Sequence, residues 1–303
     1  MTRIGHVNVI RVVVLTGLAL MAFAANSVLC RLALGTGSID AASFTVARLL
    51  SGSLTLVVVL FLRSERSLIP KYGSWMSSWM LFIYAISFSY AYITLETGTG
   101  ALILFGAVQI TMILTAVLTG TQLKSSEWIG VGVAFGGFVY LVMPGVSTPS
   151  LLGFSLMLIS GIAWGIYTLR GRGSERPLLD TAHNFMRTVP LLVILFLSTR
   201  FEMNYSTQGL IYAVLSGALA SGVGYSIWYA ALKHLSASQA AVLQLLVPVI
   251  AAMGGVLFVG ERITPRLIVS ALMVLGGIFL VILGQYEYGG GKQISDDNVD
   301  ESG

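Results

Sequence analysis

Residues Ala240 to Ile282 read AAVLQLLVPVIAAMGGVLFVGERITPRLIVSALMVLGGIFLVI, and this stretch decides the fold. It contains two apolar runs, each long enough to cross a bilayer, joined by the short polar segment 260–264. Because backbone groups in hydrocarbon must form their hydrogen bonds within the segment, each run is predicted to be a transmembrane helix. Pro248 interrupts the first helix midway and frees a carbonyl one turn upstream, where Gln244 lies. Such a break is tolerated where protein or a water-filled cavity covers it.

The same pattern occurs earlier in the chain at an offset of 139 residues, where Ala240 falls on Ala101 and Val247 on Val108. Matches of Leu, Val and Ala arise easily by chance in membrane sequences, whereas repeated arginines and a Tyr-Ala pair at one gapless offset do not. The pairs outside the stretch are Arg31 with Arg170, Arg48 with Arg187, and Tyr90-Ala91 with Tyr229-Ala230. We therefore interpret the chain as an internal duplication.

The composition is that of a polytopic membrane protein, with 56% hydrophobic and 10% charged residues. A net charge of +4 would suit nucleic-acid binding, but the basic residues lie in loops between apolar runs, so no nucleic-acid partner is expected. The single cysteine, Cys30, excludes an intramolecular disulfide and a thiolate metal cluster. No cofactor or metal site is predicted.

The N-terminal segment has two interpretations. Basic residues from Arg3 to Arg11, an apolar run and Ala22-Phe23-Ala24 resemble a signal peptide with its cleavage site. The apolar run nevertheless continues to Leu34, and its counterpart in the duplication, 151–169, is a span in the middle of the chain. An uncleaved first span is therefore favoured.

Ten transmembrane helices are predicted, in an all-α fold of two five-helix repeats at 9–143 and 151–285. Because the loops are short, consecutive helices should pack antiparallel. The polar tail from 286 to 303 is predicted to be disordered, either by nature or as a cloning remnant. The predicted spans are 9–34, 42–62, 76–94, 98–119, 126–143, 151–169, 181–199, 208–232, 237–259 and 266–285.

Basic residues are richer in the loops that follow even-numbered spans, on the side of Arg3 and Arg11. This bias predicts that both termini, 1–8 and 286–303, are cytoplasmic. Five spans per repeat is an odd number, so the second half enters the membrane from the opposite side. The prediction is an inverted-topology repeat, the architecture that alternating-access transporters use. The basic residues of the cytoplasmic loops are Arg63, Arg66, Lys71, Lys124, Arg170, Arg172, Arg176 and Lys233; Arg200, Arg262 and Arg266 lie on the other side.

The sequence LQLLVPVIAAMGGVLFVGERIT, with Pro248 mid-helix and Gly260-Glu261 at the helix end, resembles the drug/metabolite transporter superfamily in its ten-helix bacterial exporter branch. The motif GIAWG at 161–165, and Arg48 after the segment DAASF at 40–44, support the resemblance. It covers residues 9–285 and implies an inner-membrane exporter of amino acids and related metabolites, aromatic amino acids among them.

The first half departs from the pattern of that superfamily. Gln109 replaces the matching proline, Gln122 replaces the glutamate, and Ala24-Ala25 stand where a Trp is common.

Polar and aromatic side chains in mid-span are the candidates for substrate binding. Buried amides such as Gln109 and Gln244 either face a cavity or bond another helix, and the nearby Pro248 favours a cavity. Trp164 lies mid-span instead of in the headgroup belt, so its ring either stacks on an apolar substrate or packs between helices. The candidate substrate-binding residues are Asn26, Tyr84, Gln109, Trp164, Tyr167, Tyr225 and Gln244, whereas Tyr90 and Tyr229 lie near helix ends and are interpreted as belt residues.

A second set of residues is predicted to be structural or to act as hinges. The repeated arginines lie within reach of helix ends, where pairing or snorkelling is favoured over substrate contact. Small residues predict close helix crossings and would also let helices slide past one another. The set comprises Arg48, Arg187, Gly217, Ser221, Pro248 and Gly254.

Acidic residues are absent from the middle of every predicted span. A proton-coupled pump normally keeps a buried acid or histidine there, so downhill transport is predicted.

The predicted function is the export of small metabolites, above all amino acids that include aromatic or apolar ones, through a central cavity by alternating access. A multidrug transporter, or a nucleotide-sugar or phosphate-type exchanger with a cation deep in the cavity, is the alternative. A membrane lipid enzyme would need a clustered acid, base or metal constellation, and a channel would need a filter. The predicted partners are a small-molecule substrate and the lipid bilayer, with the protein as a monomer or homodimer.

Overall fold

The computed structural model describes residues 9–63, 72–120, 122–144, 148–172, 174–235 and 237–300, and every regular element in these ranges is helical. The predicted cytoplasmic N-terminus 1–8 and the loop residues Arg66 and Lys71 lie outside the described residues. The elements are α1 (Val9–Leu34), α2 (Ala41–Leu62), α3 (Trp75–Ala91), α4 (Thr97–Leu118), α5 (Ser125–Val142), α6 (Leu151–Gly171), α7 (Pro177–Thr199), α8 (Thr207–Leu215), η1 (Ser216–Val223), α9 (Gly224–Leu232), α10 (Ala237–Gln244), α11 (Leu246–Gly254), η2 (Gly255–Val259) and α12 (Pro265–Asp300).

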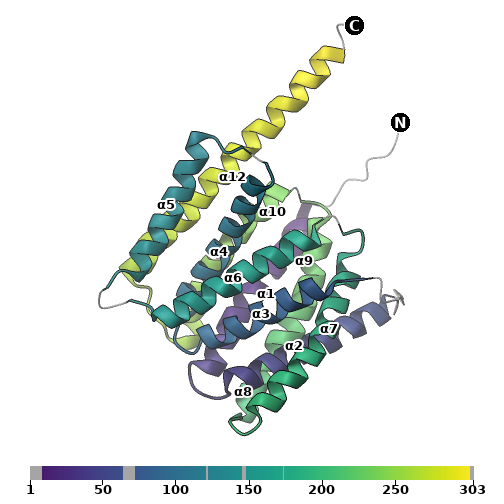
Figure 1. The fold of residues 1–303 in the computed structure, drawn as a ribbon, viewed down its shortest axis with the longest axis vertical. Coiled ribbons are helices and arrows are strands. Elements are labelled where there is room, and N and C mark those ends of the chain that lie inside the picture. The colour runs from purple at the N-terminus through teal and green to yellow at the C-terminus, as the bar shows by residue number, and fades with distance from the viewer. Residues whose placement is uncertain are drawn as a thin grey trace.

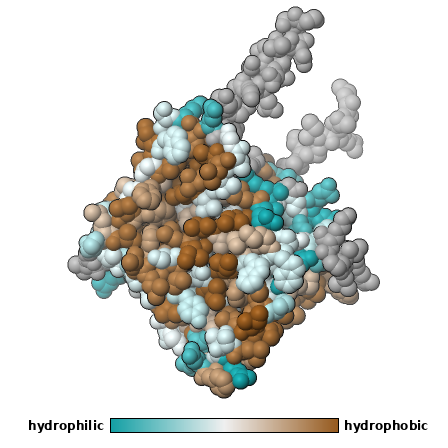
Figure 2. Space-filling view, viewed as in Figure 1, coloured by the Kyte–Doolittle hydropathy of each residue, from teal (hydrophilic) through white to brown (hydrophobic). Residues whose placement is uncertain are grey.

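Helical segments lie in each of the ten predicted ranges; their ends differ from the predicted ones by a few residues, except that α12 runs on to Asp300 and the ninth range is broken at Leu245. Within the described part of the chain, eight helices are long and apolar enough to cross a membrane. α3 has 17 residues and the apolar part of α5 runs from Glu127 to Val142, so both are shorter. Figure 2 shows a largely apolar surface with hydrophilic residues towards its edges, as a lipid-facing protein requires.

The ninth predicted span breaks where its proline predicts. α10 ends at Gln244 and α11 begins at Leu246, with a turn between them in which Leu245 N donates to the Val242 carbonyl. Pro248 has no N–H to donate to the Gln244 carbonyl four residues earlier, so the regular helix cannot pass through this point. The eighth predicted span is continuous from Thr207 to Leu232, but its middle part, η1, is π-helical.

The two halves of the chain make corresponding sets of packing contacts. α1 packs against α8, η1 and α9, which together form the eighth predicted span, and against α11. α6, the counterpart of α1, packs against the counterparts of these helices, α3 and α4. α2 packs against α8 and η1, and α7 in turn packs against α3. Three further contacts join helices at equal positions in the two halves: α2 with α7, α4 with α11, and α5 with α12. Figure 1 shows α5 and α12 lying side by side at one edge of the bundle.

Two of these three pairs are antiparallel by their end contacts. Asp40 N, at the start of α2, donates to the Asn204 carbonyl beyond α7, and Gly73 N, beyond α2, donates to Asp180 at the start of α7. In the α4–α11 pair, Thr97 at the start of α4 lies against Gly255, directly after α11, while Gln109 in the middle of α4 bonds Ala241, which precedes α11.

The third pair, α5 with α12, is antiparallel as well. Gly130 lies against Gly277, and Gly284 lies against Glu127 at the start of α5. At the far end of α5, Arg266 Nη1 donates to the Leu141 carbonyl. α12 continues to Asp300 (Figure 1), past the point at 286 where the composition predicts a disordered tail; that tail stays a prediction from composition.

Candidate functional site

A cavity of about 620 Å³ extends from the middle of the bundle to one of its ends. This volume lies within the range of small-molecule sites. All seven candidate substrate-binding residues lie on its wall: Asn26, Tyr84, Gln109, Trp164, Tyr167, Tyr225 and Gln244. They come from α1, α3, α4, α6, α9 and α10, so both halves of the chain contribute.

Trp164 is the centre of an aromatic wall. Its ring centroid lies 4.7 Å from that of Tyr84, 5.1 Å from that of Tyr167 and 5.3 Å from that of Tyr225. Tyr167 and Tyr225 stack on it at interplanar angles of 20° and 24°. Trp164 therefore both packs between helices and lines the cavity, because it is half-buried against three rings and is part of the cavity wall. Such a wall offers an apolar, polarisable surface to a solute.

The two glutamines lie on the cavity wall beside the helix break. Gln109 is buried, and its Nε2 donates to the Ala241 carbonyl of α10 at 3.5 Å. Gln109 therefore bonds another helix and lines the cavity at once. Gln244 is half-buried on the same wall and carries the carbonyl that Pro248 leaves free.

Polar side chains line the cavity towards its open end. Asp180 accepts a hydrogen bond from Gly73 N at 2.7 Å and another from the Ser174 hydroxyl, and Asn184 Oδ1 accepts one from Ser74 N at 2.8 Å. The basic residues Arg170, Arg172 and Lys233 are exposed at this end. The mouth thus coincides with loops predicted to be cytoplasmic.

The interpretation of Tyr229 as a belt residue is wrong. Its side chain lines the cavity, and its hydroxyl lies 2.8 Å from Thr181 Oγ1. The cavity reaches the end of α9, so an aromatic residue near that end faces the cavity instead of the headgroups. Three α7 residues that line the cavity were not among the candidates: Asp180, Thr181 and Asn184. Asp180 and Asn184 are four residues apart and Thr181 is next to Asp180, so the sequence already placed these polar side chains near one face of the helix.

Of the two alternatives predicted for Arg48, pairing or snorkelling, snorkelling is wrong, because the exposed fraction of this side chain is 1%. Arg48 Nη2 donates to Tyr84 Oη at 2.8 Å, and the guanidinium carbon lies 5.1 Å and 4.8 Å from the ring centroids of Tyr84 and Phe88. Arg187, at the offset of 139, behaves differently: its Nη1 donates to the Tyr72 carbonyl at 2.6 Å.

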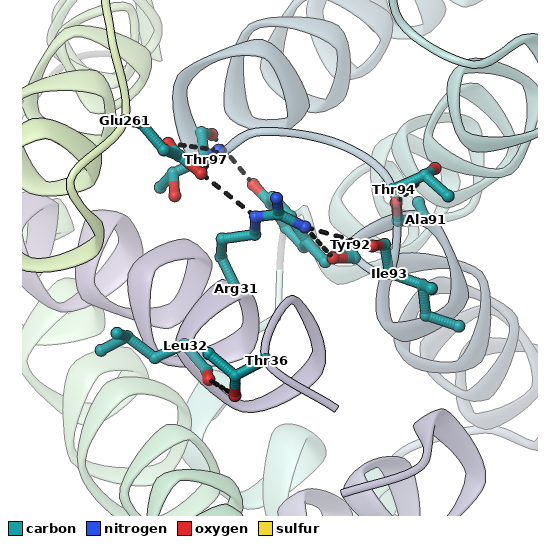
Figure 3. Close-up of polar contacts among 9 residues, drawn as sticks. All are labelled: Arg31, Leu32, Thr36, Ala91, Tyr92, Ile93, Thr94, Thr97 and Glu261. Atoms are coloured by element: carbon teal, nitrogen blue, oxygen red, sulfur yellow. Dashed lines mark hydrogen bonds and ion pairs between the residues drawn. The ribbon is translucent and has the colours of Figure 1, made fainter. Parts of the chain in front are cut away.

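A polar cluster around Arg31 lies at the end of the bundle opposite the mouth, and Figure 3 shows its contacts. Arg31 Nε lies 3.1 Å from Glu261 Oε1, and Arg31 Nη1 donates to the carbonyls of Tyr92 and Ile93. The same carboxylate accepts from Thr97 N at 2.8 and 3.0 Å. These contacts join α1, the α3–α4 loop and the segment before α12.

Glu96 lies next to this cluster. Its burial and the neighbouring Glu261 raise the pKa of the Glu96 carboxyl, while Arg31 lowers it. Arg31 is therefore the cation that offsets negative charge from both carboxyls at this end.

The remaining residues predicted to be structural lie at helix contacts. Gly217 and Ser221 are buried in η1, and a Cβ at Gly217 would collide with the Arg48 carbonyl and Ser51 Oγ. A Cβ at Gly254, directly before η2, would lie 2.7 Å from Val28 of α1. Pro248 is buried within α11. π-helical turns are often found at functional sites. Here η1 contains Gly217 and Ser221, and η2 directly follows Gly254.

The described residues contain no group of three or more His, Cys, Asp or Glu side chains that would hold a metal ion. The arrangement of aromatic rings, amides and a polar mouth suits the binding of a small amphipathic solute.

A model of the EamA-like transporter family matches residues 151–283. The chain is 50% identical over 272 residues to an uncharacterised protein of Pseudomonas aeruginosa, covering 90% of this chain and 94% of that one. It is 24% identical over 205 residues to a probable amino-acid metabolite efflux pump of Salmonella typhimurium, covering 63% of this chain and 69% of the pump. It is 29% identical over 177 residues to the threonine/homoserine exporter RhtA of Escherichia coli, covering 56% and 57%.

The fold resembles a solved crystal structure described only as that of a protein. The TM-score is 0.60 at 17% identity, and the match covers 88% of this chain and 98% of the other. At that identity the likeness concerns the fold alone.

Proposed function

We propose that this chain, which belongs to the EamA-like transporter family of the drug/metabolite transporter superfamily, exports amino acids and related small metabolites through its central cavity by alternating access. Its family is one of transporters, so the protein moves its substrate instead of transforming it. Relatives named as an amino-acid metabolite efflux pump and a threonine/homoserine exporter support the substrate class.

The cavity is the observation that carries this proposal. Its wall combines the rings around Trp164 with the amides of Gln109 and Gln244, which suits a solute with one apolar and one polar part. The aromatic wall favours amino acids with aromatic or apolar side chains, because these gain most from contact with Trp164, Tyr167 and Tyr225.

The helix packing supports two inverted five-helix repeats with ten spans. When each helix of one half is exchanged for its counterpart in the other, most packing pairs have an equivalent, whereas the contacts of α4 with α12 and of α1 with α4 have none of similar extent. The three pairs that map onto themselves are antiparallel, as a two-fold axis in the membrane plane requires. Repeats of this kind place the substrate site between the halves, where the cavity lies.

The cavity mouth defines the state and the orientation that we propose. Arg170, Arg172 and Lys233 surround the mouth, and basic loops are typical of the cytoplasmic side. The protein would then lie in the inner membrane with both termini in the cytoplasm. Its cavity would be open to the cytoplasm and closed outside by the contacts of Arg31 and Glu261.

Counterflow in proteoliposomes tests this function. Vesicles loaded with a high concentration of one unlabelled amino acid take up the same labelled amino acid only if the protein equilibrates it. Phenylalanine, leucine, threonine and homoserine form the panel, with a UDP-sugar and inorganic phosphate as the alternative class and protein-free vesicles as the control. Counterflow of at least one amino acid is expected. Counterflow of the UDP-sugar or phosphate alone, or of no member of the panel, would overturn the proposal.

A further inference from the structure

Tyr84 presents an unused hydrogen-bond donor at the cavity wall. Its Oη accepts from Arg48 Nη2 at 2.8 Å and from Asn26 Nδ2 at 3.3 Å. A phenol oxygen accepts two hydrogen bonds and donates one, so these two contacts fill its accepting capacity and leave the O–H to donate. Among the described residues, no side chain or carbonyl accepts from this hydroxyl. Tyr84 lines the cavity, where a solute can accept from it.

The position of the hydroxyl is fixed by its neighbours. Asn26 Oδ1 accepts from the Ser216 hydroxyl, so the amide of Asn26 is held with its Nδ2 towards Tyr84. Ser160 Oγ donates to the Tyr84 carbonyl at 3.0 Å, which ties α6 to this turn of α3. The donor is therefore placed by three helices before any solute arrives, and such preorganisation favours binding.

Arg48, behind Tyr84, is a buried cation without a counter-ion. Its Nε and Nη1 have no hydrogen-bond partner, and no acidic side chain of the described residues forms an ion pair with it. The guanidinium lies over the rings of Tyr84 and Phe88, and both of these residues line the cavity. A charge at this depth is costly unless something compensates it, and intramembrane charges of this kind mark substrate or ion pathways.

We propose that Arg48 and Tyr84 form an anion subsite that recognises the carboxylate of the transported solute. The inference rests on the proposed function and deepens it, because it assigns the polar end of the substrate to one place in the cavity. Tyr84 Oη donates to the carboxylate directly, and Arg48 acts through Tyr84, polarising its O–H and supplying the positive charge. The apolar part of the solute then lies along Trp164, whose ring centroid is 4.7 Å from that of Tyr84.

Binding of two ligands that differ only at the carboxyl group tests the subsite. Isothermal titration calorimetry of the full chain in detergent compares L-phenylalanine with L-phenylalaninamide, at a pH where both amines are protonated. We expect the wild-type protein to bind phenylalanine about tenfold or more tightly than the amide, which is the loss expected for one hydrogen bond to a charged group. Equal binding of the two ligands would overturn the subsite and leave the proposed function standing.

Two variants test whether Tyr84 and Arg48 cause the preference for phenylalanine over its amide. Tyr84→Phe keeps the ring and removes the donor, and Arg48→Met keeps an unbranched apolar stem and removes the guanidinium and its charge. In both, phenylalanine should weaken to within about twofold of the amide, because the charge-assisted contact is gone, while affinity for the amide should hold. Arg187→Met, at the corresponding position of the second half, is the matched control and should keep the wild-type preference.

The outcomes separate the two proposals. A preference for the carboxylate that survives in both Tyr84→Phe and Arg48→Met overturns the subsite, whatever the transport assay gives. If Arg48→Met fails to fold, the wild-type comparison and Tyr84→Phe still decide the matter. Binding or counterflow of no amino acid overturns the proposed function, and the subsite falls with it.

Discussion

Arg31 Nε lies 3.1 Å from Glu261 Oε1 across 230 residues of sequence, and this ion pair fastens α1 to the segment that precedes α12. The exposed fractions of the two side chains are 20% and 11%, so solvent screens the pair only in part. Thr97 N donates to the same carboxylate, which adds the start of α4 to the contact. The pair lies at the end of the bundle opposite the cavity mouth, so the outward-open state of the proposed alternating-access cycle would have to break it.

Removing either partner of this pair should loosen the closed end. Arg31→Met and Glu261→Gln each leave partly buried polar groups unpaired, at a cost of about 1–3 kcal/mol to the closed state. Cys30, the sole cysteine, is fully buried one residue from Arg31 and serves as a native reporter. A membrane-impermeant maleimide added to the outside of cells should label Cys30 faster in both variants than in the wild type.

The neighbouring Arg262 gives the matched control for that labelling. Its side chain is exposed. Arg262→Gln should therefore leave Cys30 as protected as in the wild type. Labelling that is equally slow in all four proteins would mean that the ion pair does not hold this end closed.

Trp164→Ala should weaken transport of aromatic substrates. The change removes the ring that joins Tyr84, Tyr167 and Tyr225, and a solute in full contact with it would lose about 1.5–3 kcal/mol of binding. Counterflow of labelled phenylalanine should fall sharply, with a raised half-saturation concentration. Trp79→Ala, which removes an exposed Trp of α3 outside the cavity, should transport phenylalanine normally. Normal transport by Trp164→Ala would assign Trp164 to packing alone.

The aromatic wall was predictable from the sequence because its residues lie far from the ends of the predicted spans. Trp164, Tyr84 and Tyr225 stand in the middle of long apolar runs, where the headgroup belt does not account for them, and the structure brings all three to one cavity. The helix break at Leu245 was predictable for a similar reason, since a proline removes one specific backbone donor.

The environment of Arg48 was not predicted, although the position of Arg48 along its helix was one indication that it is buried. Arg48 lies seven residues after Ala41, the first residue of α2, which places it about 10 Å along the helix at 1.5 Å per residue, too deep for snorkelling. Its partner Tyr84 lies on another helix, 36 residues away, and periodicity carries no record of such a contact. The same holds for Arg31 and Glu261, whose pairing depends on how the two halves dock.

Gln244→Leu should impair transport of many substrates by a similar factor. Gln244 lines the cavity beside the Gln109 contact to Ala241, and leucine there would leave polar groups of a bound solute unpaired, at about 1–3 kcal/mol. Counterflow across the amino-acid panel is the measurement. Gln208→Leu is the control, because Gln208 is exposed on α8, outside the cavity, and its Nε2 donates to Tyr212 of its own helix. A loss confined to one substrate would instead assign Gln244 a specific contact.

Gly217→Ala should destabilise the protein. A Cβ at this position meets the Arg48 carbonyl and Ser51 Oγ, so α2 and η1 must separate, at a cost of about 1–3 kcal/mol or more. Gly276→Ala is the matched control, since a Cβ there meets nothing within 4 Å and alanine favours a helix over glycine. Thermal denaturation in detergent, followed by size-exclusion chromatography, should show a lower midpoint for Gly217→Ala and no decrease for Gly276→Ala. Equal midpoints would mean that the crossing of α2 and η1 is loose.

Dissipating the proton gradient should leave counterflow unchanged. Asp180 is the acidic side chain on the cavity wall among the described residues, and two donors, Gly73 N and the Ser174 hydroxyl, already hold its carboxylate near the mouth. A coupling group has to exchange protons with both sides of the membrane in turn, and a carboxylate fixed by two hydrogen bonds at one end is poorly placed for that role. Proteoliposomes treated with a protonophore should therefore equilibrate phenylalanine at the untreated rate. If a gradient drives accumulation, transport is coupled, and Asp180→Asn is the first variant to test: loss of accumulation with intact counterflow would assign the coupling to Asp180.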